Sequence, residues 1–100
     1  MTRALAPDFQ ARVLAVLERE GTTLTEPELA RITERYARCP GREPWDIREY
    51  ASFEPQRGGR EYRVMRGTRT QDVYSSLERI TAAAVRTALN ELEALDVTPP

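Results

Sequence analysis

The sequence predicts one α+β domain, mostly helical, with two N-terminal helices, a central β-hairpin and a long C-terminal helix. Three observations predict this class. Apolar residues follow a helical spacing in the first 38 positions, alternate with polar residues between positions 45 and 66, and return to the helical spacing after position 71. With 100 residues, the chain has the length of a single small domain.

The first helix is predicted over residues 7–20. Phe9, Val13 and Leu17 recur at intervals of four, which places them on one face of a helix. The proline at position 7 suits the first turn of a helix, and Gly21 is typical of the residue that follows the last turn.

The second helix is predicted over residues 25–38 and has the clearest start signal in the chain. Thr25 followed three positions later by Glu28 is the pattern of a capping box, in which each side chain accepts the other residue's backbone N–H. The proline and glycine that follow Cys39 end the helix, because proline cannot continue it.

Residues 45–66 are predicted to form a β-hairpin. Its two arms keep the two-residue period of strands, with Ile47, Glu49, Ala51 and Phe53 on the first and Tyr62 and Val64 on the second. The Gly58-Gly59 pair between the arms is a turn signal. Trp45 and Tyr50 leave a second interpretation open, a short helix ahead of the first strand.

The last helix is predicted over residues 71–96, with a second capping-box pattern at Thr68 and Gln71. Its apolar side chains keep intervals of three and four: Val73, Leu77, Ile80, Ala84, Ala88, Leu92 and Leu95. Unbroken, such a helix spans about 39 Å, more than a globule with a radius of gyration of roughly 13 Å accommodates. We therefore expect either a break near Thr81 or a homodimer that pairs through Leu77, Ala84, Ala88 and Leu92. Residues 97–100 are expected to be a tail.

The composition excludes several kinds of site. With one cysteine, Cys39, and no histidine, the chain has no internal disulfide, no Cys/His metal cage and no histidine general base. The carboxylates fit helix caps and solvated helix faces. We therefore expect no enzymatic activity, no metal and no cofactor. No apolar run is long enough to cross a bilayer, so we expect a cytoplasmic protein without membrane contact.

The positive charge is concentrated in one segment. All 15 basic residues are arginines, although the formal net charge is −1. Between positions 56 and 70 five arginines accompany one acid, Glu61, a local net charge of +4, and these arginines are Arg57, Arg60, Arg63, Arg66 and Arg69. Guanidinium groups suit phosphate oxygens, so the segment predicts contact with a polyanion. The alternative to a binding segment is a solvated loop whose arginines only keep the protein soluble.

Two stretches resemble parts of the winged helix-turn-helix domains of bacterial transcriptional regulators. Arg57-Gly58-Gly59-Arg60-Glu61-Tyr62-Arg63-Val64 is similar to their wing and last strand. On that register, residues 26–38 are the first helix of the motif and residues 44–51 the recognition helix. Residues 80–95 are similar instead to a recognition helix, which residues 72–79 would precede. The two registers exclude each other, so which helix reads DNA stays open.

The resemblance implies a small regulatory protein that docks on double-stranded DNA through the arginine-rich hairpin. Arg86 and Asn90 share the polar side of the last helix, and arginine with guanine and asparagine with adenine are common base-reading pairs. The alternative is a protein-binding regulator with the same fold, such as an antitoxin, a phage-type inhibitor or an adaptor. The net charge of −1 and the acidic end of the last helix favour this alternative.

Overall fold

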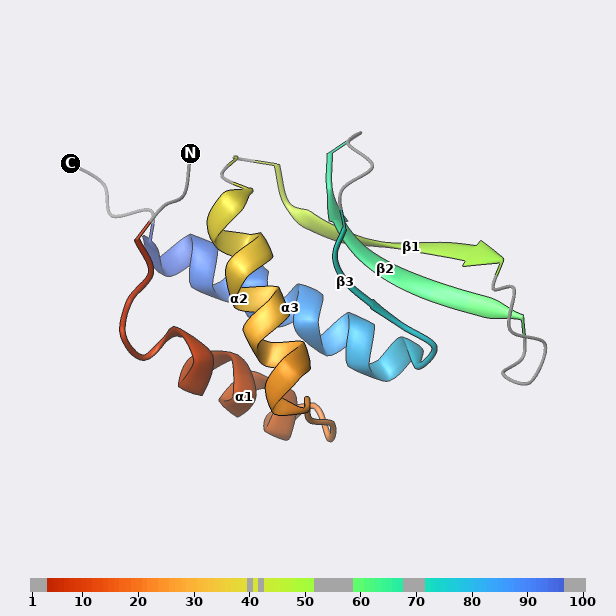
Figure 1. The fold of residues 1–100 in the computed structure, drawn as a ribbon, viewed down its shortest axis with the longest axis horizontal. Coiled ribbons are helices and arrows are strands. Elements are labelled where there is room, and N and C mark those ends of the chain that lie inside the picture. Colours follow the sequence, from red (N-terminus) through yellow and green to blue (C-terminus); the bar gives the residue numbers. More distant parts are fainter. Residues whose placement is uncertain (1–3, 40, 42, 52–58, 68–71, 97–100) are drawn as a thin grey trace.

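The described part of the chain folds as two helices, a three-stranded antiparallel sheet and a third helix, in that order (Figure 1). The computed structural model describes residues 4–39, 41, 43–51, 59–67 and 72–96. The elements are α1 (Phe9–Arg19), α2 (Glu26–Arg38), β1 (Trp45–Ala51), β2 (Arg60–Arg66), β3 (Asp72–Ser76) and α3 (Arg79–Asp96). The predicted α+β class, with two N-terminal helices and a long C-terminal helix, is confirmed.

The first two helices form where their end signals predict them. The hydroxyl of Thr25 accepts the backbone N–H of Glu28 at 3.4 Å, and the Glu28 carboxylate accepts the Thr25 N–H at 3.0 Å, so both halves of the capping box are present. Gly21 adopts a φ of +83°, and Thr22 donates its N–H to the carbonyl of Leu17 at 2.9 Å. This left-handed glycine ends α1 and turns the chain towards α2.

β1 and β2 form the predicted hairpin and pair antiparallel along their whole lengths. β3 pairs antiparallel with the other side of β2, with a register shift beside Val64 and Met65 that leaves Val73 without an opposite residue. The alternative of a short helix ahead of the first strand is wrong, because that segment is already part of the ladder. Phe53 and Gly58 lie outside the described residues.

The C-terminal helix is shorter than predicted, because residues 72–76 form β3. The helix α3 that follows has 18 residues and spans about 27 Å, which removes the need for a break or a projection. Val73 and Tyr74 have high β-propensity, and the pairing of β3 with β2, in which Tyr74 lies opposite Val64, outweighs their helical spacing. The predicted capping box at Thr68 and Gln71 lies outside the described residues.

Each of the two winged-helix registers requires a helix in a segment that forms a strand in the structure. Residues 44–51, the recognition helix of the first register, contain β1, and residues 72–79, the leading helix of the second, contain β3. The physical reason is the same in both segments. Pairing with β2 satisfies their backbone hydrogen bonds along the sheet, and a helix there would leave the backbone of β2 without neighbours.

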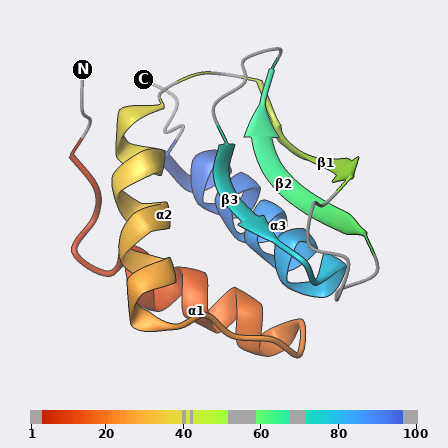
Figure 2. The ribbon, with the colours of Figure 1, turned by 45° about the vertical axis from the view of Figure 1, so that its right-hand side comes forward.

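The core surrounds α3, which lies between the sheet and α1 (Figure 2). α3 contacts all three strands on one side and α1 on another, while α2 packs on β3. Large buried side chains come from every layer: Leu17, Ile32, Tyr36, Trp45, Val64 and Leu89. The phenyl ring of Phe9 stacks on Tyr36 with their centroids 4.9 Å apart. Burial of these aromatic and aliphatic groups is the main stabilising contribution.

The apolar face of α3 is occupied inside the chain. Ala84, Ala88 and Leu92 are 2%, 0% and 7% exposed and belong to this core, and Leu77 is partly buried. They therefore do not form the predicted surface for pairing with a second copy. The reason is that the sheet, extended by β3, already covers the apolar band that a lone long helix would have exposed.

Candidate interaction surface

The structure places the arginines of the predicted DNA-binding segment in different environments. Arg57 and Arg69 lie outside the described residues. Arg60 stands at the start of β2 with 67% of its side chain exposed, and its guanidinium pairs with the Glu49 carboxylate at 2.9 Å across the hairpin. The guanidinium of Arg60 can bind a partner only if its ion pair with Glu49 breaks.

Arg63 lies on the face of the sheet turned away from α3, because its neighbour Val64 points into the core. Its guanidinium donates to the Glu61 carboxylate at 3.0 Å, lies 3.9 Å from the Asp72 carboxylate and stacks 4.4 Å from the ring centroid of Tyr50. The hydrogen bond to Glu61 raises the pKa of Arg63 above its ordinary value, outweighing the lowering that burial causes. The guanidinium is thus neutralised locally.

Arg66 is a structural cation with 6% of its surface exposed. Its guanidinium donates to the Glu93 carboxylate of α3 at 2.5 Å and to the carbonyl of Cys39 at 3.0 Å, and stacks 4.1 Å from the ring centroid of Trp45. It ties β2 to α3 and to the end of α2, and no phosphate reaches it there. The two-residue period shared with Val64, which places both on the inward face, was the sequence signal for this role.

Asn90 holds the start of β1 against α3. Its side-chain oxygen accepts the backbone N–H of Trp45 at 2.8 Å, and its amide group donates to the carbonyl of the same residue at 3.1 Å. To read a base, as predicted, this side chain would have to give up both bonds. Arg86, one turn earlier, is half-buried and forms no ion pair with a described residue.

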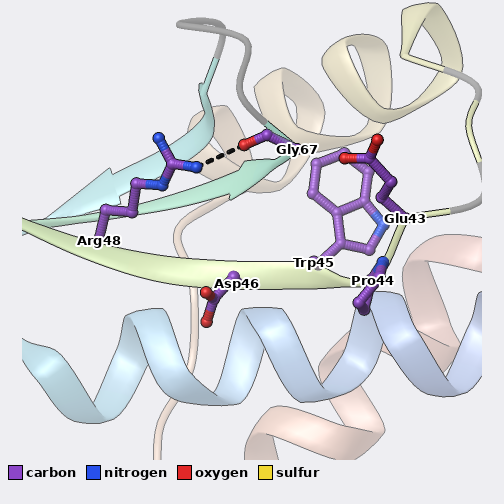
Figure 3. A pocket seen from close by; sticks show the side chains of 6 residues that line it. All are labelled: Glu43, Pro44, Trp45, Asp46, Arg48 and Gly67. Atoms are coloured by element: carbon purple, nitrogen blue, oxygen red, sulfur yellow. Dashed lines mark hydrogen bonds between the residues drawn. The ribbon is translucent and has the colours of Figure 1, made fainter.

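A shallow hollow of about 370 Å³ lies at the start of β1 (Figure 3). Its lining residues are Glu43, Pro44, Trp45, Asp46, Arg48 and Gly67. Arg48 donates to the carbonyl of Gly67 at 2.5 Å, and the buried indole N–H of Trp45 has no hydrogen-bond partner among the described residues. The charged ends of Glu43 and Arg48 point to separate places and do not converge on one spot (Figure 3).

β1 is an edge strand, with β2 on one side of it in the strand order β1-β2-β3 (Figures 1 and 2). In an antiparallel ladder, successive residues turn their backbone groups to opposite sides. The N–H and C=O of Trp45 bond Asn90, and the N–H of Ile47 bonds the Asp46 carboxylate at 2.8 Å. The odd-numbered residues of β1 therefore turn their backbone groups away from β2.

Glu49 and Ala51 continue this odd-numbered series, and no described residue bonds their backbone groups on the outer side. Asn90 closes the outer side only at Trp45, where its amide imitates a neighbouring strand. Beyond that point, the C=O of Ile47 and the N–H and C=O of Glu49 and Ala51 face outward without a partner among the described residues, while the N–H of Ile47 bonds the side chain of Asp46. Such a row is a template for another strand. Sequence reasoning missed it, because a sequence does not show which strand of a sheet lies at the edge.

Searches of protein-family models, of curated proteins and of solved structures found no match to this chain. Within the described residues, no helix is long and apolar enough to cross a membrane. The same part of the chain holds no group of three or more histidine, cysteine or acidic residues placed to bind a metal ion.

Proposed function

We propose that this chain is a protein-interaction domain that binds its partner by strand addition at the outer side of β1. The observation that carries the proposal is the row of outward-facing backbone groups at Ile47, Glu49 and Ala51. An extended segment placed there gains main-chain hydrogen bonds, and its alternate side chains supply specificity. The proposal takes up the protein-binding alternative that the sequence left open.

The charges along this edge support a polypeptide partner. Asp46, Arg48 and Glu49 follow one another on β1, so the edge carries both signs. The arginines of β2 that would attract a polyanion are neutralised by carboxylates or, at Arg66, buried. A surface of mixed charge is complementary to a segment of mixed charge and repels part of any continuous run of phosphates.

Two substitutions at one position test the proposal. Glu49→Pro removes the outward N–H and leaves the ladder to β2 intact, because proline is tolerated where the N–H of an edge strand points to solvent. Glu49→Ala is the matched control: it also loses the contact with Arg60 but keeps the N–H.

Wild type and both variants are immobilised and exposed to a nuclease-treated lysate of the source cells. A polypeptide retained by wild type and Glu49→Ala but lost from Glu49→Pro supports strand addition. Equal retention by all three proteins contradicts it.

Binding of double-stranded DNA is the second candidate, and the position of Arg60 favours it. This exposed side chain follows Arg57 in sequence at the end of the hairpin, and a phosphate can replace its partner Glu49. Four phosphate contacts, one for each arginine of the segment other than the buried Arg66, predict a log–log salt slope of roughly −3.6 in an anisotropy titration of random duplex.

Arg60→Glu is compared in that titration with Arg12→Glu, which reverses an exposed, ion-paired arginine on α1. Steeply salt-dependent binding that only Arg60→Glu abolishes supports a DNA-binding hairpin. Absent binding, or equal binding by both variants, contradicts it.

A further inference from the structure

We infer that the strand docking on β1 is the β1 strand of a second copy of this chain, paired antiparallel about Glu49. The inference rests on the proposed function and names its partner. The two three-stranded sheets join into one continuous sheet with the order β3-β2-β1-β1-β2-β3 around a two-fold axis. Unlike a seam through α3, this contact requires no core side chain to leave the fold.

Asn90 excludes two registers of the pairing. When identical strands pair antiparallel, one residue lies on the two-fold axis and residues equally distant from it face each other. An axis at Ile47 or Arg48 brings the second copy against Trp45, whose N–H and C=O are already bonded to Asn90. An axis at Glu49 leaves those bonds intact.

With the axis at Glu49, all the free backbone groups of the edge find partners. Ile47 faces Ala51 of the second copy, Glu49 faces its own equivalent, and Ala51 faces Ile47. These are the odd-numbered residues on both strands, so each pair exchanges two hydrogen bonds, about six in total. The N–H of Ile47 exchanges its present bond to the Asp46 side chain for a ladder bond.

The side chains on the outer face are complementary in this register. Arg48 faces Tyr50 of the second copy, and the two-fold axis repeats the pair. Tyr50 already stacks with one guanidinium, that of Arg63, at 4.4 Å within its own chain. A second cation on its ring follows the same electrostatic preference.

On the inner face, a small apolar pair lies beside two carboxylates and two guanidinium groups. Ile47 packs against Ala51 of the second copy. The two Glu49 carboxylates face each other, but each is already bound to the guanidinium of an Arg60 at 2.9 Å. Across the seam the order is therefore Arg60, Glu49, Glu49, Arg60, and the repulsion between the two facing carboxylates, reduced by their arginine partners, weakens the pairing.

The dimer is expected to be weak. Two short edge strands bury less than the ~1,600 Å² of a standard stable interface. Self-association is therefore expected to depend on concentration in the range from about 10 μM to about 1 mM.

Sedimentation velocity across this range, on the full chain, tests the pairing. Wild type is expected to shift from monomer to dimer, and Glu49→Ala to associate at least as well, because it removes two facing carboxylates. Glu49→Pro is expected to stay monomeric throughout. A wild type that remains monomeric at the highest concentration, or a Glu49→Pro variant that associates equally, overturns the pairing.

Amide exchange of the wild type at both ends of the range adds a readout that does not depend on how well Glu49→Pro folds. The Glu49 amide is expected to slow at least tenfold at high concentration. If it exchanges fast at both concentrations, self-pairing fails while the edge stays open to another partner. If it is protected in the dilute monomer, the edge is covered and the proposed function fails too.

Discussion

Replacing Arg66 with alanine is expected to lower the free energy of unfolding by about 3 kcal/mol. Removing one member of a buried ion pair costs about 3–5 kcal/mol. The side chains of Arg66 and Glu93 are 6% and 19% exposed, so solvent moves the loss towards the lower end of this range. Arg66→Ala also removes the bond to Cys39 and the stacking on Trp45, which adds about 0.5–1 kcal/mol each to the loss of stability.

Arg60→Ala is the matched control, because it removes the same residue type from the same strand. Its pair with Glu49 is largely exposed, and such pairs contribute about 0–1 kcal/mol. Denaturant unfolding of the three proteins measures the difference. For a domain of this size, 3 kcal/mol lowers Tm by roughly 12–24 °C. A loss below about 1 kcal/mol for Arg66→Ala, or equal losses for both variants, refutes the reasoning.

Three further substitutions test the contacts of the helices. Asn90→Ala removes both bonds to the backbone of β1 and is expected to cost about 2 kcal/mol in denaturant unfolding, and an unchanged stability contradicts the contact. Leu92→Glu is expected to abolish the cooperative thermal transition followed by circular dichroism, because it buries a charge, and a folded monomer contradicts that expectation. Thr25→Ala is expected to cost about 1 kcal/mol at pH 7. Burial by itself raises the pKa of Glu28, but hydrogen bonds from Thr25 and Tyr74 outweigh it and hold the pKa below its ordinary value of 4.5. The stability supplied by this ionised carboxylate is complete above that value and is lost as pH falls through the lowered one, so the difference between wild type and Thr25→Ala should shrink below about pH 4. A difference that does not change with pH contradicts the capping role.

The first two helices were predictable because their signals are local. Thr25 and Glu28 satisfy each other's backbone groups within one turn, and Gly21 supplies the left-handed residue that ends α1. β3 was not predictable in the same way. Val73 and Tyr74 also fit a helical spacing, and they become a strand only because β2 lies beside them, a contact that no short window of sequence contains.

The candidate site was less predictable than the fold, because the role of each arginine depends on the face it occupies. The three-residue spacing of Arg60, Arg63 and Arg66 describes one segment, but on a strand it places successive guanidinium groups on opposite faces. Arg66 thus enters the core and Arg63 meets the carboxylates of the outer face. The exposed edge at Glu49 results from the order of the strands in the sheet, and no residue type in the sequence indicates that order.

Hydrogen exchange along β1 tests most directly whether its outer side is free. In a dilute, monomeric sample the amides of Arg48 and Tyr50, which point towards β2, are predicted to exchange slowly. The amide of Glu49, which lies between them and points outward, is predicted to exchange near the rate of an unstructured peptide. Equal protection of all three amides would contradict a free edge and, with it, strand addition at β1.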